Sequence, residues 1–600
     1  TNDFIVSMDY LTGGKLGSVS VRSWDGTQFV LDESIGGEGC NLADTLCGFN
    51  NGGDIDGGPW PNYDRHGVEI QTLPRNAFTE FGADVTALVG ATPCVSTFMG
   101  KTRSSQSFSA ELKDFGAPVP FPVCGAAISI EPDGVNEVGR PHTFTVTLEQ
   151  VVAGNHFPAP DGTPVTVTLT ATNGASAVVL LDTCASPGTV GGNCRVTFTS
   201  NSAGTVTGHA AADMPLGGRF VHVETDGTGD NSDDAVKVYV DASISIGPAL
   251  DRNSVEESHT FTVNVAQNLG DGAGFVTAPD GTSVAVTLSP TGGASVSDLV
   301  DTCASPGTSG GTCTVTFTSP TAGTVTGHAS VTLDVLGVPL TRQTNGVGQN
   351  SGDAVKVFVA GALRWTKVDN ANRLLGGATF TVCRTHDYNS GTGQMDPIAA
   401  VCADILDNTA PDQDPQAGRF LLTGLVLGRY TVHERFAPAG YAPDGRTETV
   451  DLTLAAPFDE IVPSFINVRP IVKITAFGYT NAPRGTPTDG VVTGHTVYTF
   501  SVKNFGLASA TLAGSLSLSF SGSPGSFACS GTGVSGCTLD LAGIALNAGQ
   551  ELTFSLVLDY TNAPSGTSVT ASLVVDYALN GLTRQASGSP ASVTFTIQGG

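Results

Sequence analysis

Three polar residues lie on strand faces that otherwise carry apolar side chains. Side chains alternate between the two faces of a β-strand, so Lys367 points to the same side as Trp365. By the same count, Glu434 falls on the apolar face of the segment 430–434, and Asn467 shares its side with Phe465. The spacing therefore predicts that an amine, a carboxyl group and an amide enter one hydrophobic core from three strands.

Such groups are costly to bury unless they satisfy one another. Burial lowers the pKa of an amine, and a neutral amine is a nucleophile. A protonated glutamic acid beside it can polarise an amide carbonyl and shuttle protons. We therefore predict an isopeptide bond between Lys367 and Asn467, formed with loss of ammonia and with Glu434 as the internal catalyst. The alternative is a buried salt bridge between Lys367 and Glu434 alone.

The segments that surround these residues carry a family resemblance. Residues 365–369, 375–380, 424–434 and 438–441 together resemble the collagen-adhesin B-type, prealbumin-like domain of Gram-positive adhesins and pilins. The resemblance covers about 110 residues and implies a β-sandwich with a Lys–Asn isopeptide and a catalytic Glu. It also implies a single-turnover reaction of the chain on itself, so we do not expect an enzyme that processes external substrates.

The composition is that of strands and turns. The chain has 600 residues, of which 76 are Gly and 33 are Pro, and alternating apolar positions continue through nearly its whole length. We predict an all-β fold, arranged as a linear array of about five β-sandwich domains of immunoglobulin-like or jelly-roll-like type. The net charge of −28 argues against a nucleic-acid partner, and the apolar stretches are too short to span a membrane.

One internal repeat is evident in the sequence. Residues 182–189 recur at 301–308, and residues 204–209 recur at 323–328, at an offset of about 120 residues that is typical of a β-sandwich. The pattern predicts two tandem domains, at 127–241 and 242–360. They resemble the bacterial immunoglobulin-like repeats that act as stalk spacers in surface adhesins.

The same repeats contain matched lysines and histidines. Lys237 and Lys356 lie opposite the valine faces of their strands, so we expect both to be exposed. The histidines are interpreted as surface or capping residues rather than metal ligands; they are His142 with His259, and His209 with His328.

The other domains are predicted from strand rhythm and from the family resemblance. Residues 1–126 are predicted to form a jelly-roll or lectin-like sandwich, which is partial if partner strands were removed or come from another chain. Residues 361–469 are predicted to form the prealbumin-like domain, and residues 470–600 a C-terminal immunoglobulin-like sandwich. A strand at each terminus is expected to pair within its own domain, and the alternative is exchange with a neighbouring subunit.

Twelve cysteines occur as near neighbours in the sequence. The even count and local pairing predict disulfides formed in an oxidising compartment. Zinc is disfavoured because no CxxC pair is present and the histidines do not cluster beside the cysteines. The predicted pairs are Cys40–Cys47, Cys94–Cys124, Cys184–Cys194, Cys303–Cys313, Cys383–Cys402 and Cys529–Cys537.

Two acidic loops are weak candidates for calcium. Asp226, Asp230 and Asp233 offer oxygen ligands between tandem domains, although a solvated loop is the favoured interpretation. Residues 50–56, beside Trp60, are a second candidate for calcium or a sugar, with the same preference. No other cofactor is predicted.

These observations favour an extracellular structural protein of the cell surface. It would serve as a stalk, or as the repeating subunit of a filament or sheath, with exchange of terminal strands as one route to self-association. The alternative is an adhesin that binds carbohydrate or matrix through its N-terminal domain.

Overall fold

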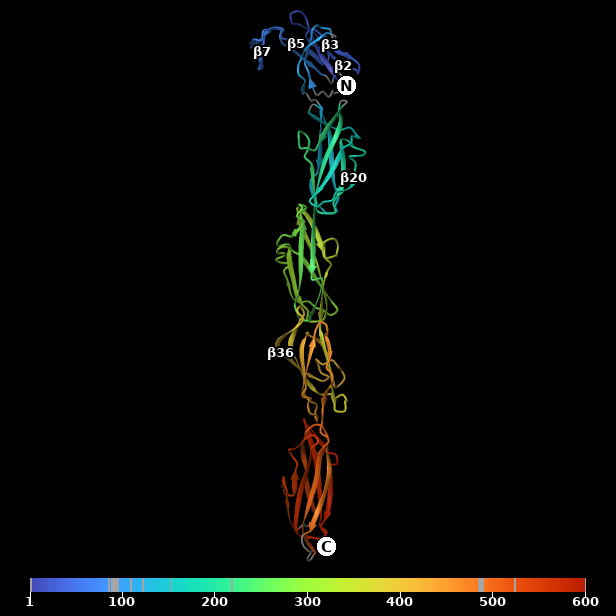
Figure 1. Ribbon diagram of the computed structural model, residues 1–600, viewed down its shortest axis with the longest axis vertical. Helices are drawn as coiled ribbons and strands as arrows, with labels where there is room; N and C mark the ends of the chain where they lie inside the picture. The colour runs from blue at the N-terminus through green and yellow to red at the C-terminus, as the bar shows by residue number, and fades with distance from the viewer. Residues whose placement is uncertain are drawn as a thin grey trace.

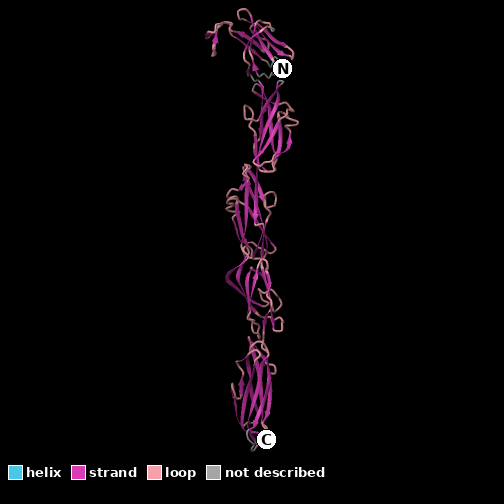
Figure 2. Cartoon of the chain, in the orientation of Figure 1, coloured by secondary structure: helices cyan, strands magenta, loops and turns pink. Residues whose placement is uncertain are grey.

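The chain is a row of β-sandwiches. The computed structural model describes residues 3–84, 87, 97–107, 110–120, 124–152, 154–216, 219–483, 490–522 and 525–598. These residues form 52 strands, which confirms the all-β prediction. Figure 1 shows the strands gathered into sandwiches that follow one another from the N-terminus to the C-terminus, and Figure 2 shows the same row by secondary structure. Buried apolar side chains of the described residues form five separate cores.

The N-terminal unit has the smallest core. The sheets β1-β2-β3 and β10-β5-β4 enclose Leu16, Val19, Val21 and Leu46, and four two-stranded sheets complete the unit. Its strands are β1 (Phe4–Tyr10), β2 (Leu16–Trp24), β3 (Phe29–Gly36), β4 (Gly39–Cys40), β5 (Leu46–Asn50), β6 (Ile55–Asp56), β7 (Asn62–Tyr63), β8 (Glu69–Ile70), β9 (Thr72–Leu73), β10 (Thr79–Ala83), β11 (Thr97–Phe98), β12 (Lys101–Arg103), β13 (Leu112–Phe115) and β14 (Val119–Pro120).

The first repeat is a two-sheet sandwich. The sheet β15-β17-β21-β20, with β18 beside β17, packs against a sheet in which β22 pairs with β19, β23 and β24, and β24 also pairs with β16. Its strands are β15 (Cys124–Glu131), β16 (Gly134–Glu137), β17 (His142–Val152), β18 (Asn155–Pro158), β19 (Thr166–Thr172), β20 (Val178–Asp182), β21 (Asn193–Thr199), β22 (Gly204–Leu216), β23 (Arg219–Glu224) and β24 (Ala235–Gly247).

The second repeat has the same arrangement. The far half of β24 pairs with β26, which pairs with β30 and β27, while β33 pairs with β25 and β31 in the opposite sheet. The strands that follow β24 are β25 (Leu250–Ser254), β26 (His259–Asn268), β27 (Phe275–Thr277), β28 (Ala285–Thr291), β29 (Ser297–Asp301), β30 (Thr312–Thr318), β31 (Gly323–Val335), β32 (Val338–Gln343) and β33 (Ala354–Val359).

The expected exposure of Lys237 and Lys356 is wrong, because both side chains are buried. The strands β24 and β33 are apolar on both faces, so alternation alone does not choose the inner one. The inner face is the one that carries Tyr239 or Phe358, whose rings fill more of the core than valine does, and each lysine shares that face. The valine beside Lys237, Val236, is 37% exposed.

Strand β24 belongs to two cores. Tyr239 lies in the core of the first repeat, and its neighbour Val240 lies in the core of the second. Because these two consecutive residues are both buried, the inward-facing side of the strand switches here. The strand therefore presents opposite faces to the two sandwiches.

A single arginine joins the two repeats. Arg342, only 12% exposed, contacts Glu137 of the first repeat through Nη1 at 2.8 Å and Asp241 through Nη2 at 2.6 Å. Its Nε donates to the carbonyl oxygen of Ala242 at 2.8 Å. Each donor thus contacts a group at or across the joint, which resists bending between the repeats.

Replacing Arg342 by Ala is expected to uncouple the two repeats. The change leaves two partly buried carboxylates without their cation, at a cost of about 2 kcal/mol. Calorimetry of the full chain should show the transitions of the repeats moving apart, and small-angle scattering should show a more bent rod. Arg252→Ala, which removes an exposed arginine of the second repeat, is the matched control, and equal behaviour of the two variants would contradict this role.

The fourth unit contains two four-stranded sheets. In one, β34 (Gly361–Asp369) pairs with β37 (Arg419–Leu425), β40 (Phe458–Glu460) and β41 (Phe465–Asn467). The other has the order β36 (Gln394–Leu406), β35 (Thr379–Asn389), β38 (Gly428–Phe436) and β39 (Thr447–Leu452). Trp365, Phe380 and Phe420 fill the core between them.

The C-terminal unit has the largest core, between a four-stranded and a seven-stranded sheet. Its strands are β42 (Val472–Pro483), β43 (Val491–Asn504), β44 (Ala510–Ser521), β45 (Ser526–Ser530), β46 (Val534–Ser535), β47 (Thr538–Asp540), β48 (Ile544–Leu546), β49 (Glu551–Pro564), β50 (Ser568–Leu579), β51 (Leu582–Gln585) and β52 (Ala591–Thr596). Both terminal strands pair within the chain, β1 with β2 and β52 with β50. No helix among the described residues is long and apolar enough to cross a bilayer.

The later joints are also held by specific contacts. Ser254 of the second repeat accepts a hydrogen bond from the backbone N–H of Leu427 at 2.8 Å. Asn580 of the C-terminal unit donates to the carbonyl oxygen of Ala437 at 2.7 Å, and Gly440 N–H donates to Leu579 at 3.1 Å. These contacts favour a stiff rod over a string of independent domains.

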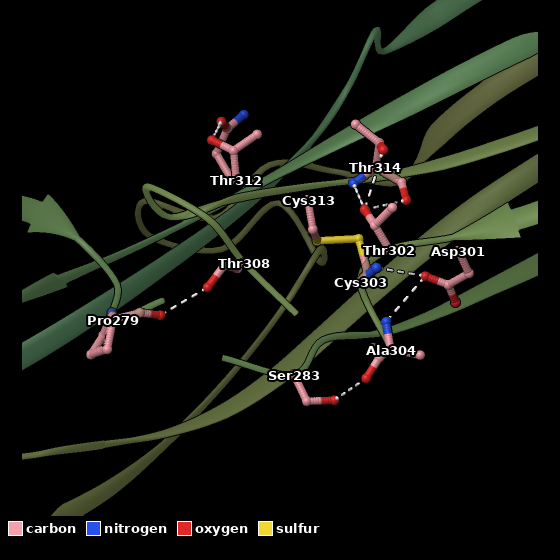
Figure 3. The surroundings of a disulfide bond; sticks show 11 residues. Pro279, Ser283, Asp301, Thr302, Cys303, Ala304, Thr308, Thr312, Cys313 and Thr314 are labelled. Atoms are coloured by element: carbon pink, nitrogen blue, oxygen red, sulfur yellow. Dashed lines mark hydrogen bonds between the residues drawn. A yellow bond between two sulfur atoms is a disulfide. The ribbon is translucent and has the colours of Figure 1, made fainter. Parts of the chain in front are cut away.

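Disulfides close short loops in each of the five units. The structure forms Cys40–Cys47, Cys184–Cys194, Cys303–Cys313, Cys383–Cys402 and Cys529–Cys537. Cys124 is disulfide-bonded, and Cys94 lies outside the described residues. Figure 3 shows how Asp301 accepts hydrogen bonds from the backbone of Cys303 and Ala304 beside the bridge of the second repeat. Each bridge of this loop size contributes about 2 to 3 kcal/mol in the chain-entropy model.

Candidate functional site

The fourth unit brings Lys367, Glu434 and Asn467 together between its two sheets. Lys367 comes from β34 and Asn467 from β41, which runs parallel to β34 with Asp369 opposite Asn467. Glu434 comes from β38 of the facing sheet, opposite Phe380 of β35. The side chains of Lys367 and Glu434 are 0% exposed, and Asn467 is equally buried.

One carboxylate oxygen is shared by the other two groups. Glu434 Oε2 lies 3.1 Å from Lys367 Nζ and accepts a hydrogen bond from Asn467 Nδ2 at 2.8 Å. Asn467 Nδ2 also donates to the carbonyl oxygen of Ala442 at 2.6 Å. Glu434 Oε1 and Asn467 Oδ1 are buried with no hydrogen-bond partner among the described residues.

Aromatic rings exclude water from the cluster. Phe380 lies 4.8 Å from Phe465, centroid to centroid, and Trp365 stacks on Phe420 at 4.8 Å. In such surroundings an ionised group loses its hydration. Burial lowers the pKa of Lys367, against the opposing effect of the Glu434 carboxylate, and so favours the neutral amine.

Asp444 positions Glu434, and sequence reasoning did not single it out. Its backbone N–H donates to Glu434 Oε2 at 2.6 Å, and its Oδ2 accepts from the N–H of Ile466, next to Asn467, at 2.8 Å. Burial works against ionisation of Asp444, but the hydrogen bonds from the backbone of Ile466 and Arg446, with the nearby Arg446 side chain, outweigh it and lower its pKa. The available signal was the Pro-Asp-Gly turn at 443–445.

This arrangement can transfer a proton from nucleophile to leaving group. Lys367 Nζ can attack Asn467 Cγ, with its proton passing to Glu434 Oε2 and then to Asn467 Nδ2, which departs as ammonia. The new C–N bond replaces the one that breaks. The geometry places Glu434 against the amide nitrogen, while the sequence had suggested polarisation of the carbonyl oxygen, which here has no donor.

The group of potential metal ligands found among the described residues lies outside the two acidic loops. Among the described residues, the side chains grouped closely enough to hold a metal are Cys40, Asp44 and Cys47, and both cysteines are in a disulfide. Asp226 accepts hydrogen bonds from Thr228 and Asn231 and so closes its own turn. Of the other acidic residues of this loop, Asp230 lies 3.8 Å from His156 and Asp233 lies beside Gly227. In the other loop, Asp54 accepts from the backbone of Arg75, Asp56 accepts from that of Gly58, and Trp60 is exposed.

The repeat histidines divide into two kinds. His209 and His328 contact Asp234 and Asp353 at 2.8 Å and are partly exposed, as expected of capping residues. His259, by contrast, is buried beside Asp251, so its interpretation as a surface residue is wrong.

Comparison with known proteins finds a family model that matches most of the fourth unit. Residues 361–457 match the model of the SpaA prealbumin-like fold domain, which confirms the predicted resemblance for this part of the chain. The match includes Lys367 and Glu434 and ends before Asn467. No curated protein matches the chain significantly.

Solved structures of low similarity include three bacterial proteins. The major pilin BcpA of Bacillus cereus is 13% identical, with 57% of this chain and 99% of that chain covered and a TM-score of 0.25. The major pilin SpaD of Corynebacterium diphtheriae is 13% identical, with 57% and 97% covered and a TM-score of 0.23. The TIE protein of Bacillus anthracis is 12% identical, with 79% and 72% covered and a TM-score of 0.24. At these scores the likeness carries no argument about function.

Proposed function

We propose that this chain is an extracellular structural protein of the cell surface, a rod that serves as a stalk or as the repeating subunit of a filament. Its fourth unit is locked by an isopeptide bond between Lys367 and Asn467. The observation that carries the proposal is the contact of both residues with one oxygen of Glu434 inside a dry core.

The position of the bond suits a load-bearing rod. Strand β34 is the first strand of the fourth unit and β41 is its last, so they lead to the second repeat and to the C-terminal unit. The strands run parallel and side by side. A pull on the two ends of the chain would then pass through the amide bond and bypass the strands between them.

Intact mass tests the bond. After reduction of the disulfides, the wild-type deficit from the sequence mass should exceed that of Lys367→Met by about 17 Da, one ammonia. A digest should yield a peptide that joins the segments of Lys367 and Asn467. Equal deficits and two separate peptides would leave Lys367 and Glu434 as a buried ion pair and remove the covalent lock.

Electron microscopy of the purified chain distinguishes the two forms of the proposal. Fibres would support a filament subunit, and single rods would support a stalk. Globular particles would contradict both.

A further inference from the structure

The second repeat contains a buried amine in contact with a carboxylate. Strand β25 runs parallel to β33, with Asp251 opposite Lys356 in the register. Lys356 Nζ lies 2.7 Å from Asp251 Oδ2, and the lysine side chain is fully buried. The two side chains therefore need to span only the gap between neighbouring strands, and the backbone pairing of β25 with β33 before and after them holds the pair in register.

A buried histidine contacts the same oxygen. His259 Nδ1 lies 3.3 Å from Asp251 Oδ2, and His259 Nε2 is buried without a partner among the described residues. Burial, together with the charge of Lys356, lowers the pKa of His259 to about 4, so the ring is neutral at physiological pH. Because its Nδ1 lies within reach of the carboxylate, Nδ1 can carry the proton and donate it to Oδ2.

The nearby glutamate is occupied elsewhere. Glu257 accepts hydrogen bonds from the backbone of Ser254 at 3.1 Å and from that of Ser390 at 3.3 Å. Asp251 is consequently the carboxylate that the structure places on the Lys356 amine.

The first repeat lacks this arrangement. Lys237 is as buried as Lys356, but the residue opposite it in the register is Gly134. Lys237 Nζ lies only 3.0 Å from where a Cβ on Gly134 would be, so the amine occupies the space that a side chain there would take. The adjacent Asp133 accepts the backbone N–H of Val236 at 2.6 Å. The two repeats thus contain one buried lysine with an acyl partner, Lys356, and one without, Lys237.

We propose that Lys356 and Asp251 form an amide cross-link in the second repeat, with release of water. The ammonium and carboxylate of the ion pair contain all the atoms. A C–N bond forms between Nζ and Cγ as the Cγ–Oδ2 bond breaks. Oδ2 leaves as water with two protons of the ammonium, one of them relayed through His259, and the third proton stays on the amide nitrogen.

The geometry favours condensation over hydrolysis. Groups held in contact react with effective molarities of about 10⁵ to 10⁸ M, which offsets the tendency of water to hydrolyse amides. The product also removes the charge of a fully buried lysine, which is costly to keep in an apolar core. The side chain of Asp251 is 44% exposed, which gives the released water a path to solvent.

The test is made on the full, reduced chain and needs no variant at first. After denaturation, an amine-reactive reagent should label Lys237 fully and leave Lys356 unlabelled, and a digest should contain a peptide that joins the segments of Asp251 and Lys356. Full labelling of Lys356, with its segment recovered as a separate peptide, would overturn the proposal and leave an ion pair.

Variants separate this bond from the one in the fourth unit. Lys356→Met and Asp251→Ala should each reduce the deficit from the sequence mass by about 18 Da, one water, while Lys237→Met should not change it. Lys367→Met should reduce the deficit only by the about 17 Da, one ammonia, that belongs to the bond in the fourth unit. Either cross-link can therefore fail without affecting the evidence for the other, and an unchanged deficit in Lys356→Met would contradict the present one.

Discussion

A chain with Glu434→Gln is expected to fold without forming the Lys367–Asn467 bond. Gln keeps the shape of the side chain but cannot accept the proton of Lys367 and pass it to Asn467 Nδ2, the two groups that Glu434 Oε2 contacts. The variant should therefore keep the Asn467 amide nitrogen. After reduction of the disulfides, its deficit from the sequence mass should be about 17 Da smaller than that of the wild type.

The same variant should lose several kcal/mol of stability in the fourth unit. A cross-link that closes a loop of roughly 100 residues contributes about 4.7 kcal/mol in the chain-entropy model, and a buried lysine without its carboxylate costs a further 3 to 5 kcal/mol or so. Calorimetry should show a sharp fall in the transition temperature of the fourth unit. Glu460→Gln, an exposed position on β40, is the control, and a persisting cross-link in Glu434→Gln would show that another group is the catalyst.

Replacing Lys237 by Met is expected to stabilise the first repeat. Burial lowers the pKa of Lys237 from 10.5 to about 8, and no opposing charge contributes to that shift. The shift corresponds to a penalty of about 3 kcal/mol for keeping the ammonium charged in the folded state. Met has similar length and no charge, so the penalty disappears while the core stays filled.

The gain should depend on pH in a defined direction. Below pH 8 the lysine is charged in both the folded and unfolded states, so the full penalty applies. Between pH 8 and 10.5 the unfolded chain binds more protons than the folded one, so wild-type stability rises with pH. At pH 7 the variant transition should lie roughly 10 °C above the wild type, and the gap should close near pH 10.5. A gap independent of pH would indicate a packing effect alone.

The sequence predicted the cluster of the fourth unit because each of its three strands has one clearly apolar face. Lys367, Glu434 and Asn467 follow aromatic or branched residues at a spacing of two, and the structure buries all three. Lys237 and Lys356 were misread because their strands are apolar on both faces, and only the size of the ring at the next inward position decides between them.

Other features depend on contacts that strand periodicity does not encode. Asp444 lies in a turn, where the position of a backbone N–H is set by the whole fold. The Asp251–Lys356 contact depends on the parallel register of β25 and β33 across about a hundred residues of sequence. The disulfides were more accessible to prediction, because partners near in sequence leave few alternatives.

The strand shared by the two repeats also bears on how the chain acquires its structure. When the first repeat has folded, pairing of β24 with β22 fixes the strand from Ala235, and its far half extends beyond that core with a free edge. Strand β26 can then add to an edge that is already ordered, which lowers the entropy cost of starting the next sheet. The second repeat should therefore fold faster after the first than alone, in the order in which the ribosome releases them.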